Sequence, residues 1–264
     1  MKFESAPSQV EKAVMENYWR SMETKGRHVL ALSAEYIAEA LSRFHKQPIN
    51  EIKALVLKTI LESPEPEDLR PEAVDIIFDG IMNGEKVFIW TVGDEGEYVD
   101  EERHIAYPEY NFQRRKIDGS GLMKTLQERA LKETGDSQII TESISLDINA
   151  ENKISSLRKT LKELAQKDIR QVFVVDDQQE NIHAVEELQK DFPEIVIHTW
   201  WLNNSSDKGD ISAFKKFIEE QRKTVVDPFV LVLDWDDTIY DELKRMKRTV
   251  HNLEQSLSNP NGLV

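Results

Sequence analysis

The sequence predicts an α/β protein: a Rossmann-like parallel sheet with helices on both faces, plus a separate helical region. Two observations predict this class. Helical periodicity without a convincing strand runs from about residue 8 to 83, and after Gly84 short apolar runs alternate with helical stretches. Strands that alternate with helices are typical of a parallel sheet covered on both faces. We therefore expect a helical cap or lid at 1–84, with 240–264 as its second half, and an α/β core at 85–239.

Composition narrows the function classes. The chain has 264 residues, no cysteine and a net charge of −15. The lack of cysteine excludes disulfide scaffolds, thiolate catalysis and cysteine-bound zinc. The negative charge makes nucleic acid and anionic membranes poor partners. No apolar run approaches the roughly 18–20 residues of a membrane span, and the first residues lack the apolar core of a signal peptide. We therefore expect a cytoplasmic protein without a nucleic-acid or membrane partner.

The N-terminal region contains four stretches in which apolar residues recur at helical spacing. The stretches begin near Val10, Val29, Ile49 and Pro71, and the proline-rich segment 63–67 separates the last two. Proline does not continue a helix interior, so a break is expected there. Four amphipathic helices predict a small bundle or lid whose residues serve packing rather than chemistry.

The remaining sequence contains five apolar runs typical of buried strands, with helical segments between them. The predicted strands are 86–91, 138–146, 171–175, 194–199 and 229–233. The predicted helices are 113–133, 153–167, 180–190 and 210–223. In parallel sheets of this kind, ligands bind beyond the carboxyl ends of the strands. The residues that follow each run are therefore the candidates for chemistry.

Acidic and hydroxyl side chains follow three of these runs. The last run leads into Asp234-Trp-Asp-Asp-Thr238, the run at 171–175 leads into Asp176-Asp177, and the first run ends at Thr91. Lys153 opens the helix before the third run. Carboxylates that converge within a few ångströms repel one another, so either some of them are protonated or a cation lies among them. Mg²⁺ fits, because it prefers oxygen ligands and sites that also hold phosphate.

This set of residues favours phosphoryl transfer. Asp234 would attack phosphorus as a nucleophile, and Asp236, two residues further on, would protonate the leaving oxygen. Thr91 would supply a hydrogen bond, and Lys153 a positive charge, to the transferred phosphoryl group. Each residue also has a simpler interpretation. Asp and Thr cap helices at strand-to-helix turns, Thr91 ends a strand, and Lys153 fits a solvated helix face.

With these residues the chain resembles the haloacid-dehalogenase-like hydrolases. Asp234-Trp-Asp-Asp-Thr238 is similar to the DxDxT signature of that family, and the run ending at Thr91 is similar to its second motif. Lys153 and Asp176-Asp177 have a separation similar to that of the third and fourth motifs. The resemblance covers roughly residues 86–238, and four motifs at the proper strand ends are more specific than DxDxT alone.

The resemblance implies a Mg²⁺-dependent phosphatase that works through an aspartyl-phosphate on Asp234, with Asp236 as general acid and then general base. It also implies that Mg²⁺ is held by the Asp234 carboxylate, the Asp236 backbone carbonyl and one of the pair Asp176 and Asp177; the family pattern favours Asp177. A substantial cap further implies a small phosphorylated substrate, because a lid restricts access by protein-sized ones.

The motif order departs from the family, in which the nucleophile motif comes first. Here it comes last, which resembles a circular permutation with the cut inside the cap. Permutation predicts that the strand at 229–233 lies between those at 86–90 and 171–175, all parallel. It also predicts that the helix at 240–257 packs against the helices of residues 8–83. The alternatives are that the N-terminal helices dock elsewhere or that they pair with a second chain, which would make a dimer.

Two further features depart from the family pattern. Asp237 stands where the family often has glycine, and the acidic stretch 95–110 is longer than the second motif needs, which predicts a flap.

The sequence also leaves two rival functions open. One rival is a receiver-like phosphoacceptor domain with Asp234 as the phosphorylated residue. It requires two further strands after Asp234, where only 30 residues remain and their pattern is helical. The other rival is a catalytically silent binding module with the hydrolase fold.

Overall fold

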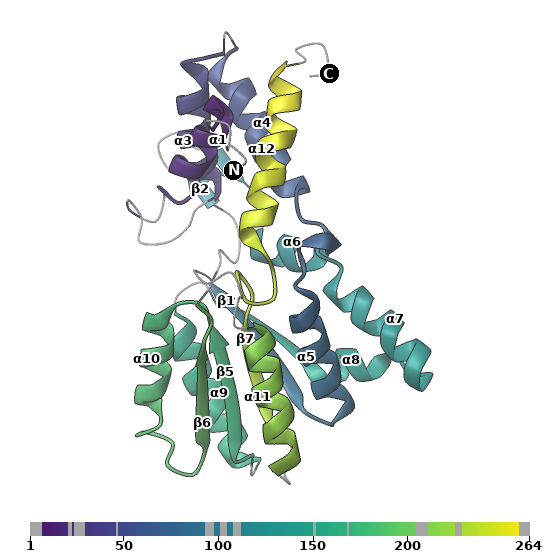
Figure 1. Cartoon of the computed structure of the whole chain (residues 1–264). Helices are drawn as coiled ribbons and strands as arrows, with labels where there is room; N and C mark the ends of the chain where they lie inside the picture. The colour runs from purple at the N-terminus through teal and green to yellow at the C-terminus, as the bar shows by residue number, and fades with distance from the viewer. Residues whose placement is uncertain are drawn as a thin grey trace, which may run out of the picture. The chain divides into compact units, whose positions relative to one another are not determined.

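The computed structural model of this protein forms two compact units (Figure 1). The helical unit comprises residues 1–65, 93–119 and 242–264, and the α/β unit comprises residues 66–92 and 120–241. The residues whose structure is described are 7–20, 23, 30–45, 47–92, 98–100, 105–107, 112–149, 152–167, 169–203, 211–224 and 229–258.

The α/β unit is built on a five-stranded sheet in which every pairing is parallel (Figure 1). Its strands are β1 (Lys86–Val92), β4 (Ile144–Asn149), β5 (Gln171–Asp176), β6 (Val196–Trp201) and β7 (Val230–Asp234). They lie in the order β4-β1-β7-β5-β6. The predicted α/β class is confirmed. The predicted position of the last strand, between those of the second and fourth motifs, is confirmed as well.

Helices cover both faces of this sheet. The helical elements of this unit are the 3₁₀ turn η1 (Pro66–Asp68), α5 (Pro71–Met82), α7 (Leu122–Thr134), α8 (Gln138–Ser143), α9 (Lys153–Gln166), α10 (Gln179–Leu188) and α11 (Ile211–Thr224). On one face, Leu161 of α9 and Val185 of α10 join Val174 of β5 in a buried cluster. On the opposite face lie α5 and α11, and Phe217 of α11 contacts Phe173 of β5 (Figure 1).

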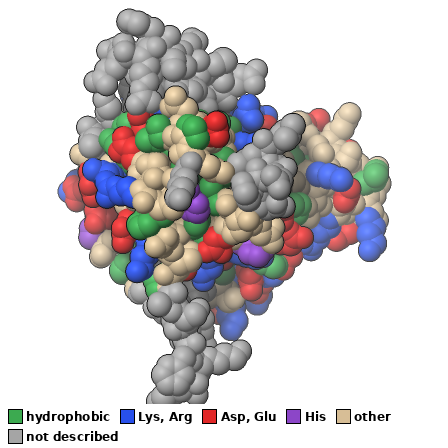
Figure 2. Space-filling model, turned by 90° about the horizontal axis from the view of Figure 1, so that it is seen from above, with side chains coloured by type: hydrophobic (Ala, Val, Ile, Leu, Met, Phe, Trp, Pro, Cys, Tyr) green, Lys and Arg blue, Asp and Glu red, His purple; other side chains and the backbone are tan. Residues whose placement is uncertain are grey.

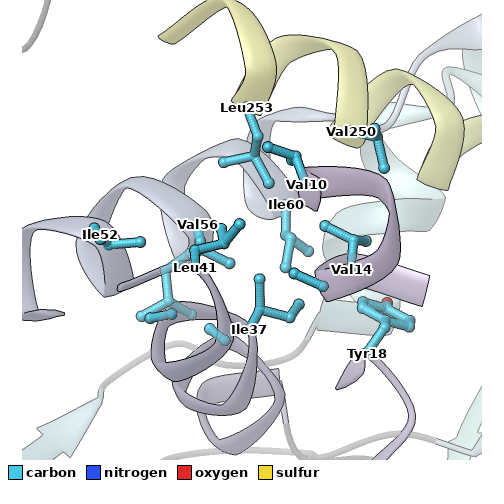
Figure 3. Packing of buried hydrophobic residues seen from close by; sticks show 14 of the residues in the cluster. Val10, Val14, Tyr18, Ile37, Leu41, Ile52, Val56, Ile60, Val250 and Leu253 are labelled. Carbon is cyan, nitrogen blue, oxygen red and sulfur yellow. The ribbon is translucent and has the colours of Figure 1, made fainter. Parts of the chain in front are cut away.

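In the helical unit, segments from both ends of the chain pack around one apolar cluster (Figure 3). The helices are α1 (Gln9–Asn17), α3 (Leu30–Ser42), α4 (Ile49–Glu62) and α12 (Glu242–Ser258). Figure 3 shows Val10 and Val14 of α1, Ile60 of α4 and Leu253 of α12 converging on this cluster. The prediction that residues 240–257 pack against the N-terminal helices is therefore confirmed.

The segment that follows β1 belongs to the helical unit. It contains α6 (Phe112–Gly119), which contacts α4, and the short antiparallel strands β2 (Tyr98–Asp100) and β3 (Ile105–Tyr107). Both strands lie in the stretch 95–110, for which the sequence predicts a flap; the rest of that stretch lies outside the described residues.

The predicted strand at 138–146 is wrong in its first half. Its first residues form the helix α8, and β4 begins only at Ile144. Ile140 is fully buried and α8 packs against α7, so tertiary packing overrides the strand propensity of this short run. The predicted helix at 113–133 is divided into α6 and α7, because Gly121 takes a left-handed φ of 67°.

The two units divide the chain at different residues from the predicted boundary at 84. Helix α5 belongs to the α/β unit, where it packs against β1 and α11 and its residues Ile77 and Ile81 are buried. An amphipathic pattern shows that a helix has a buried face, but it does not show which element covers that face.

Charged groups are interspersed on the face of the molecule that Figure 2 displays. Figure 2 shows acidic, basic and apolar side chains mixed among the described residues of the face that it displays. Within the described part of the chain, no helix is both long enough and apolar enough to cross a membrane.

Candidate active site

The register of β5 and β7 brings two aspartates together at the carboxyl edge of the sheet. Val175 pairs with Leu233, so the next residues of the two strands, Asp176 and Asp234, are neighbours. Side chains alternate between the two faces of a strand. Because Val174 packs on the α9 side, Asp176 and its neighbour Asp234 also point toward that side. Both are buried, with 0% and 2% of their surface exposed.

Lys153, the first residue of α9, lies between these two carboxylates. Its Nζ is 2.9 Å from Asp176 Oδ2 and 2.7 Å from Asp234 Oδ1. The Asn152 side chain accepts hydrogen bonds from backbone N–H groups of the first turn and so caps the N-terminus of α9. The Lys153 Nζ also lies 5.5 Å from the centre of the Trp90 ring. A helix N-terminus disfavours a cation, so the two carboxylates account for the burial of this ammonium group.

The buried charges shift one another's pKa values. Burial raises the pKa of the Asp234 carboxyl well above its ordinary value; the charge of Lys153 opposes this shift, whereas Asp176 and Asp236 add to it. Burial alone would lower the pKa of the Lys153 ammonium, but the charges of Asp234 and Asp176 outweigh it and raise that pKa. One lysine therefore does not compensate all of the negative charge gathered at this edge.

Asp177 completes a group of three carboxylates suited to a metal ion. One carboxylate oxygen from each of Asp176, Asp177 and Asp234 lies within 4.8 Å of the other two. Asp176 also accepts hydrogen bonds from Asn181 Nδ2 (3.0 Å) and from the backbone N–H of Gln178 (2.9 Å). Asp177 is the most exposed of the three, and burial followed by the charge of Asp176 raises the pKa of its carboxyl.

A tight turn after β7 holds Asp236, which is half-buried. The backbone N–H of Tyr240 donates to the carbonyl of Trp235 (3.0 Å), and the N–H of Asp237 donates to the carbonyl of Tyr240 (2.8 Å). Asp237 has a φ of 54°, in the left-handed region that glycine adopts freely and aspartate tolerates.

The two threonines lie close to this edge in the α/β unit. Trp90 pairs with Asp234 across β1 and β7, so Thr91 is one residue further along β1, with its side chain on the opposite face of the sheet. Thr91 is buried. Thr238 is also buried, and its Oγ1 has no hydrogen-bond partner within the described structure.

The candidate residues thus come from four elements of a single unit. Comparisons of the chain with protein-family models, with curated proteins and with solved structures find no match. The chemistry of this site is therefore inferred from its geometry. The described structure brings Lys153, Asp176, Asp177 and Asp234 into direct proximity, and it places Thr91 and Asp236 on adjoining segments.

Two residues outside the predicted site support it, and only the first has a signal in the sequence. Asn181 stands in the first turns of α10, five residues after Asp176, and this spacing is a signal for its hydrogen bond to that carboxylate. Trp201, at the end of β6, donates its indole N–H to the backbone carbonyl of Asp177 (2.9 Å). No local pattern in the sequence indicates that contact, because it depends on the pairing of β6 with β5.

Proposed function

We propose that the protein is a Mg²⁺-dependent phosphatase that hydrolyses a phosphate monoester through an aspartyl-phosphate on Asp234. One observation carries the proposal: Lys153 lies between Asp176 and Asp234, with Asp177 beside them, at the carboxyl edge of a parallel sheet. This is the edge at which α/β proteins bind ligands. The central position of β7 also supports a permuted relationship to the haloacid-dehalogenase-like hydrolases.

The donor set of the cluster fits a hard divalent cation. The three carboxylates offer only oxygen atoms, which Mg²⁺ prefers, and they gather more negative charge than Lys153 balances. We assign Asp234, Asp177 and the backbone carbonyl of Asp236 as ligands, with Asp176 holding Lys153 beside them. When bound, the ion supplies positive charge that offsets these carboxylates and the phosphoryl oxygens.

In the first step, Asp234 is the nucleophile. Its Oδ1 accepts the backbone N–H of Trp235 (2.7 Å) and pairs with Lys153, so neither of these donors occupies Oδ2. Oδ2 forms a bond to phosphorus while the bond from phosphorus to the leaving oxygen breaks. Asp236 donates a proton to that oxygen. Lys153 binds the phosphoryl oxygens as charge develops on them.

In the second step, water releases the phosphate. Asp236, deprotonated by the first step, removes a proton from a water molecule that attacks the same phosphorus. The bond between phosphorus and Asp234 breaks, which yields inorganic phosphate and the free carboxylate. Because burial raises the pKa of Asp234, the positive charges around it are needed to keep this nucleophile ionised.

We propose a small phosphorylated molecule as the substrate. The helical unit is a substantial body with its own apolar core, and a cap of that size favours small substrates over protein-sized ones.

The described residues give less support to a receiver-like phosphoacceptor domain. A receiver leaves Asp236, on the turn after β7, without a role.

The test compares Asp234→Asn with Asp236→Asn in single-turnover assays on an aryl phosphate and an alkyl phosphate. We expect Asp234→Asn to reduce turnover to background, to form no covalent phosphate and to bind Mg²⁺ more weakly. We expect Asp236→Asn to keep Mg²⁺ binding and to lose about 10²–10⁴-fold in rate on the alkyl phosphate, the usual contribution of proton transfer. The loss is smaller on the aryl phosphate, whose leaving group barely needs a proton.

Asp191→Asn is the matched control, because it removes a surface carboxylate that pairs with Arg158 away from the cluster. It should behave like the wild type in both assays. Normal turnover by Asp234→Asn would contradict the assignment of the nucleophile. Equal losses by both variants on both substrates would contradict the separate roles of the two aspartates.

A further inference from the structure

Backbone hydrogen bonds with Ile239 and Tyr240 close the turn that carries Asp236, and those with Tyr240 involve the peptide groups on both sides of Asp236. The backbone N–H of Tyr240 donates to the carbonyl of Trp235 (3.0 Å), which belongs to the peptide group before Asp236. The backbone N–H of Asp237, in the peptide group after Asp236, donates to the carbonyl of Tyr240 (2.8 Å). The two bonds form a parallel bridge between Asp236 and Tyr240. The position of the Asp236 backbone therefore depends on where Tyr240 lies.

Tyr240 in turn is held by a segment from the other end of the chain. Its hydroxyl donates to Asp68 Oδ2 (2.8 Å), a residue 172 positions earlier in the sequence. Its ring stacks on Trp235, with centres 5.3 Å apart and an angle of 16° between the planes. Asp68 and Tyr240 are both fully buried. The hydroxyl and the ring together determine the orientation of Tyr240.

Backbone hydrogen bonds fix the same two segments to each other. The N–H of Asp241 donates to the carbonyl of Asp68 (2.8 Å), and the N–H of Arg70 donates to the carbonyl of Ile239 (2.9 Å). Leu69 and Tyr240 form an antiparallel bridge between these bonds. Both segments belong to the α/β unit, where η1 leads into α5 and the turn follows β7.

We propose that Asp68 and Tyr240 are positioning residues for the general acid and base Asp236. The inference rests on the proposed phosphatase function. A general acid acts only within hydrogen-bond reach of the leaving oxygen, so a small displacement of its backbone reduces proton transfer. The Asp68 carboxylate accepts a hydrogen bond from the Tyr240 hydroxyl and so orients Tyr240. Tyr240 in turn orients both peptide groups that flank Asp236.

The experiment measures kcat and KM for Tyr240→Phe and Asp68→Ala on an alkyl and an aryl phosphate. Tyr240→Phe keeps the stacked ring and removes only the hydroxyl. We expect both variants to lose about 10–100-fold in kcat on the alkyl phosphate, as is common when a supporting residue is removed from a site. On the aryl phosphate the loss should be less than about threefold, because its leaving group needs little protonation. At saturating Mg²⁺, KM should not change. Mg²⁺ affinity should fall, because the Asp236 carbonyl that we assign as a ligand belongs to the peptide group that is bonded to Tyr240.

Asp68→Asn provides the rescue, because its amide oxygen can still accept the Tyr240 hydroxyl; it should restore most of the rate on the alkyl phosphate. Tyr36→Phe is the matched control, since it removes a tyrosine hydroxyl from α3 in the helical unit and should leave both rates unchanged. If Tyr240→Phe does not fold, the comparison of Asp68→Ala with Asp68→Asn still tests whether proton transfer by Asp236 depends on the hydrogen bond between Asp68 and Tyr240.

Three outcomes would overturn the inference. Equal losses on the two substrates would show a general structural effect. Wild-type rates in Tyr240→Phe and Asp68→Ala would show that Asp236 does not depend on this contact. A wild-type protein without phosphatase activity would remove the proposed function together with the inference that rests on it, whereas the other two outcomes leave the proposed function intact.

Discussion

Lys153 shows how a single residue makes the acidic cluster compatible with folding. A buried carboxylate is costly unless it is paired and hydrogen-bonded, and Asp176 and Asp234 share the one ammonium group. The lysine occupies the first position of α9, where the helix dipole opposes a cation. Its burial there indicates that the pairing with both carboxylates outweighs the dipole and the loss of solvation.

The shared lysine does not remove the cost of ionising Asp234. We therefore expect the free energy of unfolding of the metal-free protein to depend on pH. The folded pKa of Asp234 is raised above the ordinary value of 3.8, so the folded state retains a proton that the unfolded chain has released. The free energy of unfolding should therefore rise as the pH falls from above the folded pKa toward 3.8. The gain is about 1.4 kcal/mol for each unit by which the pKa is raised.

Urea unfolding at a series of pH values, in the presence of a chelator, measures this effect. Asp234→Asn lacks the titrating group, so its unfolding free energy should depend less on pH over the same range. Asp191→Asn serves again as the surface control and should follow the wild type. An identical pH dependence in wild type and Asp234→Asn would contradict the raised pKa.

At the scale of elements, α12 illustrates how a helix at the end of the chain completes a core that begins with α1. Its buried residues Met246, Val250, Leu253 and Leu257 recur at spacings of four and three, which places them on one face of the helix. That face meets residues of α1 and α4 (Figure 3). Most of the stability of such a helix comes from this packing rather than from its own propensity.

Truncation of one leucine in α12 tests the importance of this packing. Leu253 has none of its surface exposed, so Leu253→Ala should lower the free energy of unfolding by about 2–5 kcal/mol. Leu243, on the same helix, is 47% exposed, and Leu243→Ala should change it by less than about 0.5 kcal/mol. Chemical denaturation of both variants measures the difference. Equal stability of the two would contradict the packing of α12 in the helical unit.

At the scale of the whole molecule, the order of elements in the chain differs from their order in space. β7 is last among the strands in sequence and central in the sheet, and α12 joins helices from the start of the chain. Neither arrangement depends on where the chain begins, because the contacts that hold them are between elements. The fold should therefore tolerate a different choice of chain ends.

A chain with new ends tests this expectation. Figure 3 shows Val10 of α1 near Leu253 of α12, so a short glycine-serine linker can join the segment before α1 to the segment after α12. The new ends are opened between α11 and β7, so that β7 comes first. We expect this chain to fold with the same far-ultraviolet circular dichroism, and to keep any phosphatase activity of the wild type within about threefold. Failure to fold would show that the native chain order is required.

The sequence by itself determined the elements and the edge where the acidic groups gather. Periodicity is a local property, so the helices at both ends and most of the strands could be read directly, as could the aspartates that follow β5 and β7. Because parallel strands end at one edge of a sheet, those aspartates could also be expected to converge. The short run at 138–146 was the exception, because four to eight apolar residues fit a buried helix as well as a strand.

Only the tertiary structure decided which groups meet. It placed Lys153 against both Asp176 and Asp234, assigned α5 to the α/β unit, and joined Asp68 to Tyr240 across 172 positions. These contacts depend on strand register, on which face a helix covers, and on segments that are distant along the chain. Local sequence encodes none of these directly, because each is set by the packing of the whole unit.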